Sequence, residues 1–350
     1  MKTRETKKQQ ETDVILSEAT DGINKVRLMG TARTEEEEEE CPWEEIDAYS
    51  GRFVVAGYRY GVGGDNYHPW LAYSTDGGKT WTKSETTADK DQTHGRLLAL
   101  AYGGGRFVVA GYRYGSSGGT TDNYHPWLAY STDGGEKWIP STTTSDEGQT
   151  HGELQALTYG GGHFVVAGYR YGVGGDNYHP WLAYSTDGGK TWIKSETTAN
   201  EDQPHGQLYA LAYGGGRFVV AGYRYDSSGD TANNYHPWLA YSTDGGETWT
   251  PSTTTSDTSQ THGLLYALAY GGGRFVVAGY QYGSGSGSGT RDDYHPWIAY
   301  SSDGGDTWTP STTTGANESQ SHGELHALTY APDSYCWQFG TEKEDEDEEN

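Results

Sequence analysis

The sequence predicts an all-β fold, a β-propeller of four-stranded blades, and three observations lead to this prediction. A motif of eight residues, Ser-x-Asp-x-Gly-x-x-Trp, occurs five times, and the residue numbers of its aspartates increase by 57, 54, 57 and 59. Repeats of this length are typical of propellers, solenoids and arrays. The composition, with 52 Gly, 29 Tyr and 12 Trp, and short runs of Val, Thr and Tyr without a helical period favour strands and turns.

Each repeat contains four candidate strands separated by turn residues. In the second repeat the first strand covers 99–102, and three glycines separate it from the second strand at 106–112. A long polar loop leads to the third strand at 127–130, and the motif itself leads to the fourth at 137–139. A four-stranded antiparallel unit of this size, copied in series, is a propeller blade.

The repeats also show a longer period of 111 residues, because repeats one and three nearly match, as do repeats two and four. This pattern indicates a recent duplication of a two-blade segment. Such a duplication copies incidental residues as faithfully as functional ones, so identity between repeats does not identify a binding site.

The eight-residue motif resembles the Asp-box, or BNR repeat, of sialidase-like β-propellers. Four copies fit Ser-x-Asp-x-Gly-x-Thr-Trp, and Lys137 replaces the threonine in the second. The resemblance implies a turn between the third and fourth strands, in which Asp accepts backbone N–H groups, Gly adopts unusual backbone angles and Trp packs under the next blade. Non-catalytic lectins, sorting receptors and photosystem assembly factors also carry the motif, so it predicts fold rather than function, and we expect a non-catalytic member. The predicted structural residues are Ser74, Asp76, Gly78, Trp81, Ser131, Asp133, Gly135, Trp138, Ser185, Asp187, Gly189, Trp192, Ser242, Asp244, Gly246, Trp249, Ser301, Asp303, Gly305 and Trp308.

The two ends of the chain predict how the ring closes. Residues 19–26 align with the motif as a degraded copy, preceded by an apolar run at 14–16. Residues 325–330 repeat the first strand of a blade, and 335–339 stand where a second strand should be. Five complete blades and one composite blade would give six in all and leave no free edge strand, whereas a five-bladed ring with loose ends is the alternative.

The domain boundaries follow from this closure. We expect a disordered segment at 1–12, the propeller at 13–340 with an acidic loop at 35–40, and an acidic disordered tail at 341–350.

Connections in an antiparallel meander alternate between two faces, so the long loops of all blades share one face. We call it the long-loop face and expect ligand binding there. Aromatic rings beside hydrogen-bonding groups suit sugars, and one weak site per blade would gain from multivalency. The candidate ligand-binding residues are Tyr58, Arg59, Tyr67, His68, Trp70, His94, Arg113, Tyr124, His125, Trp127, His151, Arg170, Tyr178, His179, Trp181, His205, Arg224, Tyr235, His236, Trp238, His262, Tyr294, His295, Trp297 and His322.

Structural explanations compete with ligand binding for the same residues. The tryptophans of the Trp70 set are expected to pack between blades, and the histidines could equally tie long loops to backbone carbonyls. Two histidines per blade fall short of a closed metal site, so we predict no metal and no cofactor.

The sialidase resemblance implies a catalytic site of three arginines, a tyrosine with its glutamate, and an aspartate, drawn from different blades. Here four arginines of the Arg59 type recur in equivalent places, and Gln281 replaces the fifth. The Phe/Tyr-Arg-Ile/Leu-Pro sequence and a singular pair of carboxylates do not stand out. We therefore assign no catalytic residue and predict a non-enzymatic carbohydrate-binding module, with a protein-binding scaffold as the alternative and a divergent glycoside hydrolase third.

The net charge limits the kinds of binding partner. With 24 basic and 49 acidic residues the formal net charge is −25, which disfavours nucleic acid and anionic membranes as partners.

No apolar run approaches the length of a membrane span, and no hydrophobic core follows the basic start, so we expect a cytoplasmic monomer, or a secreted one if the sequence is truncated. Cys41 and Cys336 lie near opposite ends, and either a disulfide or free thiols would fit them.

Overall fold

The computed structural model describes residues 13–19, 26–31, 51–60, 67–86, 94–114, 124–143, 151–171, 178–197, 205–225, 235–254, 263–282, 294–312 and 323–331. All regular elements in these ranges are strands, as the sequence predicts. Among the same residues, no helix is long and apolar enough to span a membrane.

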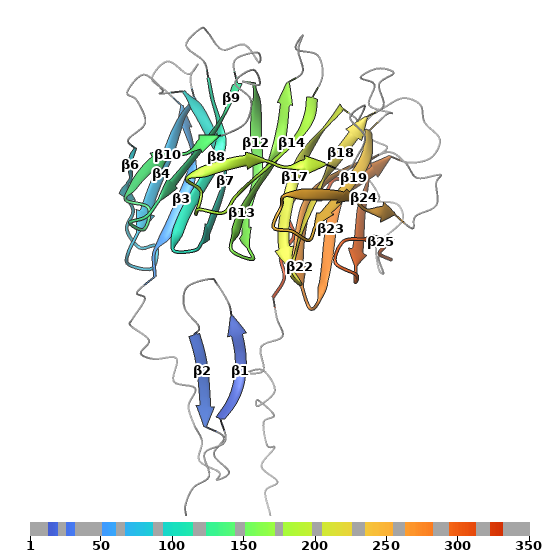
Figure 1. Cartoon of the computed structure of the whole chain (residues 1–350), viewed down its shortest axis with the longest axis horizontal. Coiled ribbons are helices and arrows are strands. Elements are labelled where there is room, and N and C mark those ends of the chain that lie inside the picture. Colours follow the sequence, from blue (N-terminus) through green and yellow to red (C-terminus); the bar gives the residue numbers. More distant parts are fainter. Residues whose placement is uncertain are drawn as a thin grey trace, which may run out of the picture.

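Five blades follow one another along the chain (Figure 1). Blade 1 has three described strands, β3 (Phe53–Tyr60), β4 (Tyr67–Ser74) and β5 (Thr82–Lys83). Blade 2 has β7 (Gly95–Gly103), β8 (Arg106–Tyr114), β9 (Tyr124–Ser131) and β10 (Lys137–Pro140). Blade 3 has β12 (Gly152–Gly160), β13 (His163–Tyr171), β14 (Tyr178–Ser185) and β15 (Thr191–Lys194). Blade 4 has β17 (His205–Gly214), β18 (Arg217–Tyr225), β19 (Tyr235–Ser242) and β20 (Thr248–Pro251), and blade 5 has β22 (Gly263–Gly271), β23 (Arg274–Tyr282), β24 (Tyr294–Ser301) and β25 (Thr307–Pro310).

A short strand from each of blades 1 to 4 adds to the outer edge of the next blade, which was not predicted from the sequence. These strands are β6 (Glu85–Thr86), β11 (Thr142–Thr143), β16 (Glu196–Thr197) and β21 (Thr253–Thr254), and each pairs in parallel with the fourth strand of the following blade. The serine before each of them makes a second link: the Ser84 hydroxyl donates to the Gly135 carbonyl at 2.6 Å. Neighbouring blades are therefore joined by backbone and side-chain hydrogen bonds at the rim.

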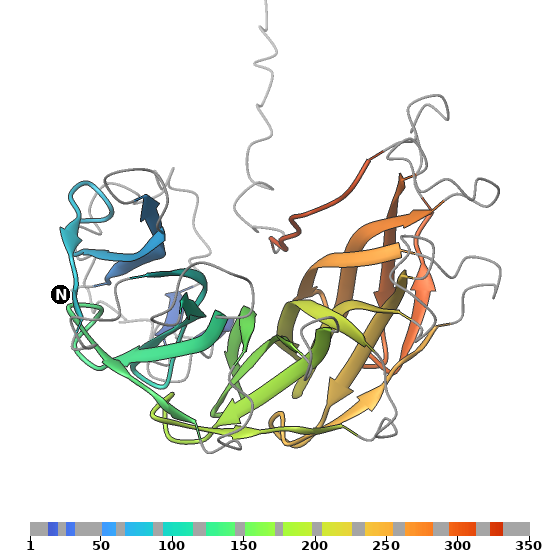
Figure 2. The ribbon, with the colours of Figure 1, turned by 90° about the horizontal axis from the view of Figure 1, so that it is seen from above.

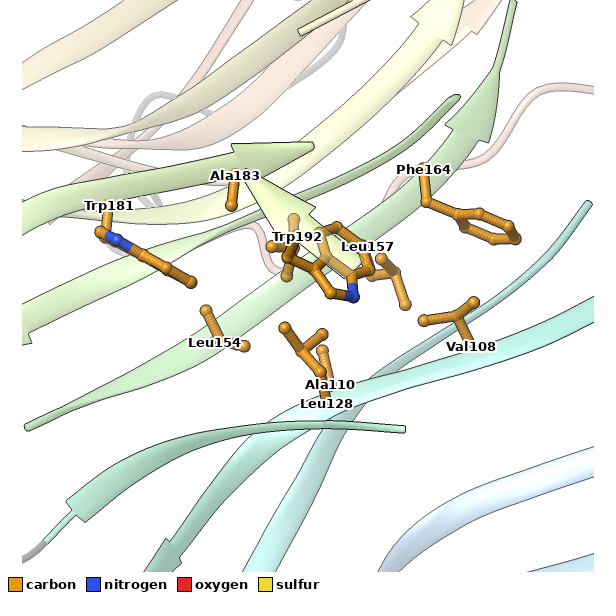
Figure 3. Packing of buried hydrophobic residues seen from close by; sticks show 10 residues of the cluster. Val108, Ala110, Leu128, Leu154, Leu157, Phe164, Trp181, Ala183 and Trp192 are labelled. Carbon is orange, nitrogen blue, oxygen red and sulfur yellow. The ribbon is translucent and has the colours of Figure 1, made fainter. Parts of the chain in front are cut away.

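Apolar clusters between the blades form the core. Figure 3 shows one such cluster, in which Trp192, Phe164 and Leu154 of blade 3 pack against Val108 and Leu128 of blade 2. The Asp-box tryptophan thus packs against the preceding blade, not the next one as expected. The same direction holds for Trp138, Trp249 and Trp308.

The inner strands β7, β12, β17 and β22 lie next to one another across the blades. Each ends on a glycine that is covered by a tyrosine of the next inner strand. A Cβ on Gly160 would lie 2.0 Å from the Tyr213 ring, so a side chain has no room there.

The blades form an arc that does not close within the described residues (Figure 2). At the blade 1 end the core face is open: Phe53 is 52% and Trp81 44% exposed, while the equivalent Phe164 and Trp192 are at most 1% exposed. The reason is that no strand among the described residues packs on this face of blade 1.

The two ends of the chain match the predicted composite blade in part. β1 (Asp13–Ala19) and β2 (Val26–Thr31) form an antiparallel hairpin, as expected for a third and fourth strand, but among the described strands they pair only with each other. Residues 325–330, expected to be a strand, have no regular strand pairing, and their predicted partner at 335–339 lies outside the described residues. Tyr330 nevertheless covers Gly271 as Tyr270 covers Gly214, so this segment occupies the place of a sixth inner strand. Six blades therefore stays a prediction.

Candidate functional site

An arginine and a histidine lie opposite each other in the strand register at the long-loop end of blades 1 to 4. In blade 1, Arg59 on β3 lies opposite His68 on β4 in the strand register. The same cross-strand pairs are Arg113 with His125, Arg170 with His179 and Arg224 with His236, while Gln281 lies opposite His295. Arg59 and Arg224 are exposed and the described histidines are half-buried. Blades 1 to 4 therefore offer a cationic and a hydrogen-bonding group at this end, and blade 5 offers hydrogen-bonding groups.

The histidines also pair across the blade interfaces. His68 of blade 1 lies beside His94, which precedes the inner strand of blade 2, with ring centroids 4.9 Å apart. The equivalent distances are 5.1 Å between His125 and His151 and 5.0 Å between His179 and His205. The start of the third strand of one blade therefore lies beside the start of the inner strand of the next blade. The long loops that lead into these two strands are thus on the same face, as predicted. His262 and His322, the predicted partners of His236 and His295, lie outside the described residues.

Burial keeps one of these imidazoles neutral. The pKa of His179 is lowered, first by desolvation and then by the neighbouring His205 and Arg170. A cation beside a buried imidazole disfavours a second positive charge, so this group acts as a neutral hydrogen-bonding group near pH 7.

The candidate tryptophans fill the blade interfaces. Trp127, Trp181 and Trp238 are each 8% exposed and belong to the apolar clusters, and Trp297 packs against one of them. Trp70 is half-buried in blade 1. Their burial matches the packing role that the sequence analysis favoured for this set.

Three tyrosines form a compact group in each of blades 1 to 3, which we call a tyrosine trio. In blade 1 the trio is Tyr58, Tyr60 and Tyr67, with centroids 5.2 to 6.0 Å apart. In blade 2 it is Tyr112, Tyr114 and Tyr124, with centroids 4.7 to 5.6 Å apart. The trio of blade 3 is Tyr169, Tyr171 and Tyr178, and in blades 4 and 5 the pairs Tyr223 with Tyr235 and Tyr280 with Tyr294 occupy the equivalent places.

Sequence reasoning missed a second set of residues, on the inner strands. These strands share the pattern Gly-x-Leu-x-Ala-Leu-x-Tyr, and its first two variable positions differ most between blades. The first variable position holds Arg96, Glu153, Gln207 and Leu264, with Glu324 in segment 323–331; the second holds Leu98, Gln155, Tyr209 and Tyr266, with His326 in that segment. A β-bulge falls at this second position in all four inner strands, because the register skips that residue. Variation at two positions in otherwise repeated strands was the signal that could have found them.

In blades 3 and 4 and in segment 323–331, the side chains at these two positions hydrogen-bond to each other. The Gln155 amide donates to Glu153 at 2.8 Å, the Tyr209 hydroxyl donates to Gln207 at 2.6 Å, and His326 lies 2.9 Å from Glu324. Unlike the Arg59 set, these groups are not equivalent from blade to blade, so they give the ring an asymmetric lining.

Glu153 is the electrostatic centre of this lining. Burial raises the pKa of its carboxyl, against the opposing effects of a hydrogen bond from Tyr169 and the charge of Arg96. Burial raises the pKa of Tyr124 to about 12, with further contributions from a hydrogen bond to Tyr114 and from the Glu153 charge. Burial and the Glu153 charge also raise the pKa of Tyr169 above its usual value. Tyrosines of two blades therefore surround one carboxylate.

The opposite face of each blade carries the Asp-box turns, in the structural role predicted for them. In the first box the Thr80 amide and hydroxyl donate to Asp76 at 2.9 and 2.6 Å, and the Gly78 amide donates to Ser74 at 2.8 Å. These bonds, the Thr80 hydroxyl foremost, lower the pKa of Asp76 to about 2. The glycines of the turn have positive φ, 72° at Gly77 and 88° at Gly78.

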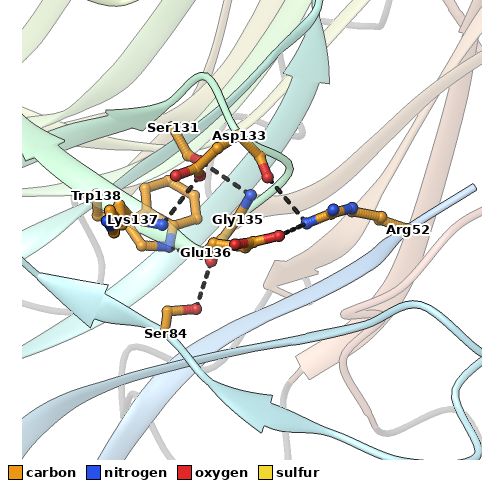
Figure 4. Close-up of polar contacts among 8 residues, drawn as sticks. All are labelled: Arg52, Ser84, Ser131, Asp133, Gly135, Glu136, Lys137 and Trp138. Atoms are coloured by element: carbon orange, nitrogen blue, oxygen red, sulfur yellow. Dashed lines mark hydrogen bonds and ion pairs between the residues drawn. The ribbon is translucent and has the colours of Figure 1, made fainter.

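Arginines tie these turns to the preceding blade. In Figure 4, Arg52 of blade 1 donates to the Asp133 carbonyl at 2.9 Å and pairs with Glu136 at 2.5 Å. Arg106 and Arg217 donate to the carbonyls of Asp187 and Asp303 in the same way. The box is thus a blade-to-blade joint, and the ligand candidates remain on the other face. Within the described part of the chain, no three His, Cys, Asp or Glu side chains are placed to hold a metal ion.

Two family comparisons match the chain. The BNR repeat-like domain covers residues 104–313, and a BNR/Asp-box repeat covers 72–83. The chain therefore belongs to the BNR repeat-like domain family, and its sequence of antiparallel blades is the β-propeller fold of sialidase-like proteins. A search of curated proteins finds no match.

Solved structures give distant fold similarities. A Trypanosoma rangeli sialidase in complex with sialic acid is 14% identical with a TM-score of 0.43, and the match covers 72% of this chain and 44% of that one. A protein of unknown function from Dyadobacter fermentans is 17% identical with a TM-score of 0.43, over 71% of this chain and 75% of that one. The matched region thus spans less than half of that sialidase.

Proposed function

We propose that the chain is a non-enzymatic binding module that recognises carbohydrate through several equivalent sites on the long-loop face. The observation that carries the proposal is the recurrence of one group of side chains, an arginine opposite a histidine and a second histidine from the next blade, at consecutive interfaces. A tyrosine trio lies beside each group in the first three blades.

The chemistry of this group suits a sugar. Guanidinium and imidazole N–H groups hydrogen-bond to hydroxyls, and the face of a tyrosine ring packs on the apolar face of a pyranose. Each group is small, so one site alone would bind weakly. Several sites on one rigid arc would bind a branched or repeating glycan with higher avidity.

A glycan-array screen of the full chain, followed by calorimetry on each hit, tests the proposal. We expect more than one equivalent site per chain and no release of product. Arg170→Gln should remove one site and leave the others unchanged, because the sites lie in different blades. Lys79→Gln is the matched control, since it removes a cation from the Asp-box face. An array without hits among neutral and acidic glycans would contradict the proposal and favour a protein-binding scaffold.

A divergent glycoside hydrolase is the third candidate, after the protein-binding scaffold, and the observation in its favour is that Tyr169 is hydrogen-bonded to the Glu153 carboxylate. A carboxylate that accepts the proton of a tyrosine could make its oxygen a nucleophile. Against this role, burial and the negative charge of Glu153 favour the protonated phenol. Fluorogenic glycosides, including a sialoside, separate the two proposals: turnover that is lost in Tyr169→Phe would establish the hydrolase and contradict the binding module.

A further inference from the structure

The tyrosine trio of blade 1 holds a cation. The Arg96 guanidinium, from the inner strand of blade 2, lies over the Tyr67 ring at 3.6 Å and over the Tyr58 ring at 4.7 Å from their centroids. The Arg96 Nε atom is buried and has no hydrogen-bond partner among the described residues. The guanidinium therefore lies against two aromatic faces, with the Glu153 carboxylate close enough to interact with its charge.

The repeat places the same strand position against the trio of each preceding blade. Inner strand β7 packs on β3 and β4, and β12 packs in the same way on β8 and β9. In blade 5 this position holds Leu264, which packs with Tyr223 and Tyr235 of blade 4. The first variable position of an inner strand thus caps the trio of the blade before it.

The cap over the blade 2 trio is Glu153. A carboxylate here replaces the guanidinium that fills the blade 1 trio, while the ring spacings of the two trios stay similar, 5.2 to 6.0 Å and 4.7 to 5.6 Å. Tyr114 and Tyr124 are half-buried, and Tyr112 is 3% exposed. Blade 2 therefore combines an aromatic group of the kind that holds a cation with a negative charge beside it.

We propose that Tyr112, Tyr114 and Tyr124, together with Glu153, bind the guanidinium or ammonium group of a ligand. Arg96, which the inner strand of blade 2 places on the blade 1 trio, stands in for that group and shows how a tyrosine trio of this chain holds a cation. The aromatic faces attract the cation through their quadrupole, and the carboxylate supplies the counter-charge. Gln207 and Leu264, which carry no charge, occupy the capping position over blades 3 and 4, and Glu324 of segment 323–331 is the other carboxylate at this position. The blade 2 trio also lies beside one of the proposed glycan groups, and its carboxylate is what distinguishes the cation site from the repeated glycan sites.

Charge in the surroundings acts in both directions. Arg96 lies close enough to oppose part of the Glu153 charge. The net charge of −25 over the whole chain favours the approach of cations from solution. The shared chemistry, an organic cation, could come from an arginine or lysine side chain or from an amino sugar.

NMR titration of the full chain with acetyl-arginine amide, and with the neutral isostere acetyl-citrulline amide, tests the proposal directly. We expect the arginine probe to bind and the citrulline probe to bind at least about tenfold more weakly. Glucosamine with N-acetylglucosamine as its neutral counterpart forms the second arm. The cation that binds more tightly identifies the source, and failure of both cations would overturn the site.

Variants locate the bound cation. Glu153→Gln should weaken binding by about tenfold or more, whereas Glu196→Gln, which removes an exposed carboxylate from β16, should leave it unchanged. Tyr124→Phe should keep binding because the ring face remains, and Tyr124→Leu should lose it. Equal effects of Glu153→Gln and Glu196→Gln would mean that the probe follows net charge alone, and the proposal would fail.

A gain of binding gives a test that does not depend on folding of the Glu153 variant. Arg96→Ala empties the blade 1 trio, so this variant should bind one additional guanidinium probe. An unchanged stoichiometry in a folded Arg96→Ala protein would show that a tyrosine trio does not take a free cation, and it would overturn the inference.

Discussion

At the residue scale, a few hydrogen bonds account for the residues that the Asp-box turn requires. Each aspartate bonds to the backbone of its own turn, and in four of the five boxes a threonine hydroxyl adds a bond to the second carboxylate oxygen. The second box lacks this bond because Lys137 replaces the threonine, although the Lys137 amide still donates to Asp133 at 3.0 Å. The second box therefore differs from the other four by the loss of one side-chain hydrogen bond.

Exchanging the residue between two boxes measures that bond. Lys137→Thr should raise the free energy of unfolding by about 0.5 kcal/mol, and Thr248→Lys should lower it by a similar amount, because a hydrogen bond at an exposed turn contributes at the low end of the usual range. Urea unfolding of the two variants checks the signs. A shift of both variants in the same direction would contradict this account of the box.

The histidine interface predicts a pH dependence of stability. The pKa of His179 in the folded state is below its usual value near 6.5. As the pH falls through 6.5, the unfolded chain is therefore protonated at this histidine before the folded chain is. The contribution of neutral His179 to the free energy of unfolding is therefore complete above pH 6.5 and is lost as the pH falls toward the lowered pKa. Urea midpoints at pH 7.5 and 5.5 should differ less in His179→Asn than in the unchanged protein. The same pH dependence in both would show that this group does not titrate on unfolding.

At the element scale, the sequence was sufficient where a pattern is long and repeated. The four strands of blades 2 to 5, the glycine turns and the Asp-box position follow from period, turn residues and apolar runs. The two-residue strands such as β6 carry no such pattern, because their pairing depends on the neighbouring blade. The packing direction of Trp192, toward blade 2, also could not be derived from a sequence that does not say which side of a sheet faces which neighbour.

The contacts between inner strands predict a strict requirement for glycine. Gly160→Ala should destabilise the protein by about 2 kcal/mol, because the added Cβ would lie 2.0 Å from the Tyr213 ring and packing must yield. Gly162→Ala is the control: nothing lies within 4 Å of its Cβ, and its φ of +87° costs about 1 kcal/mol of backbone strain. Equal denaturation midpoints for the two variants would mean that the tyrosine does not pack on the strand end.

The candidate site was predictable in kind but not in arrangement. The recurrence of Arg59, His68 and Tyr67 types pointed to the long-loop face, and the structure brings them together there. Whether His94 would meet His68 depended on the interface between blades, and the role of Glu153 depended on which trio it caps. Neither follows from spacing along the chain.

At the scale of the whole molecule, the open end at blade 1 bears on the number of blades. Phe53 lies on the same face as the buried Phe164 but is 52% exposed in the described arc. A propeller closed by a sixth, composite blade would cover it, since free blade edges and exposed apolar faces promote aggregation.

Truncation of these two phenylalanines tests the closure. Phe164→Ala should cost about 3 to 5 kcal/mol, as for a buried aromatic residue. We expect Phe53→Ala to cost a similar amount in solution, because the composite blade buries the ring. Guanidinium unfolding of both variants gives the comparison. A change within about 0.5 kcal/mol for Phe53→Ala would show an open arc with five blades.

The central claim is that the repeated groups of the long-loop face bind glycan at several sites without turnover. Calorimetric stoichiometry on the full chain, with the strongest glycan of an array screen, tests it most directly. We predict more than one equivalent site per chain, with one site lost in Arg170→Gln. A stoichiometry of one that is unchanged by Arg170→Gln would contradict the claim and assign recognition to the asymmetric inner strands.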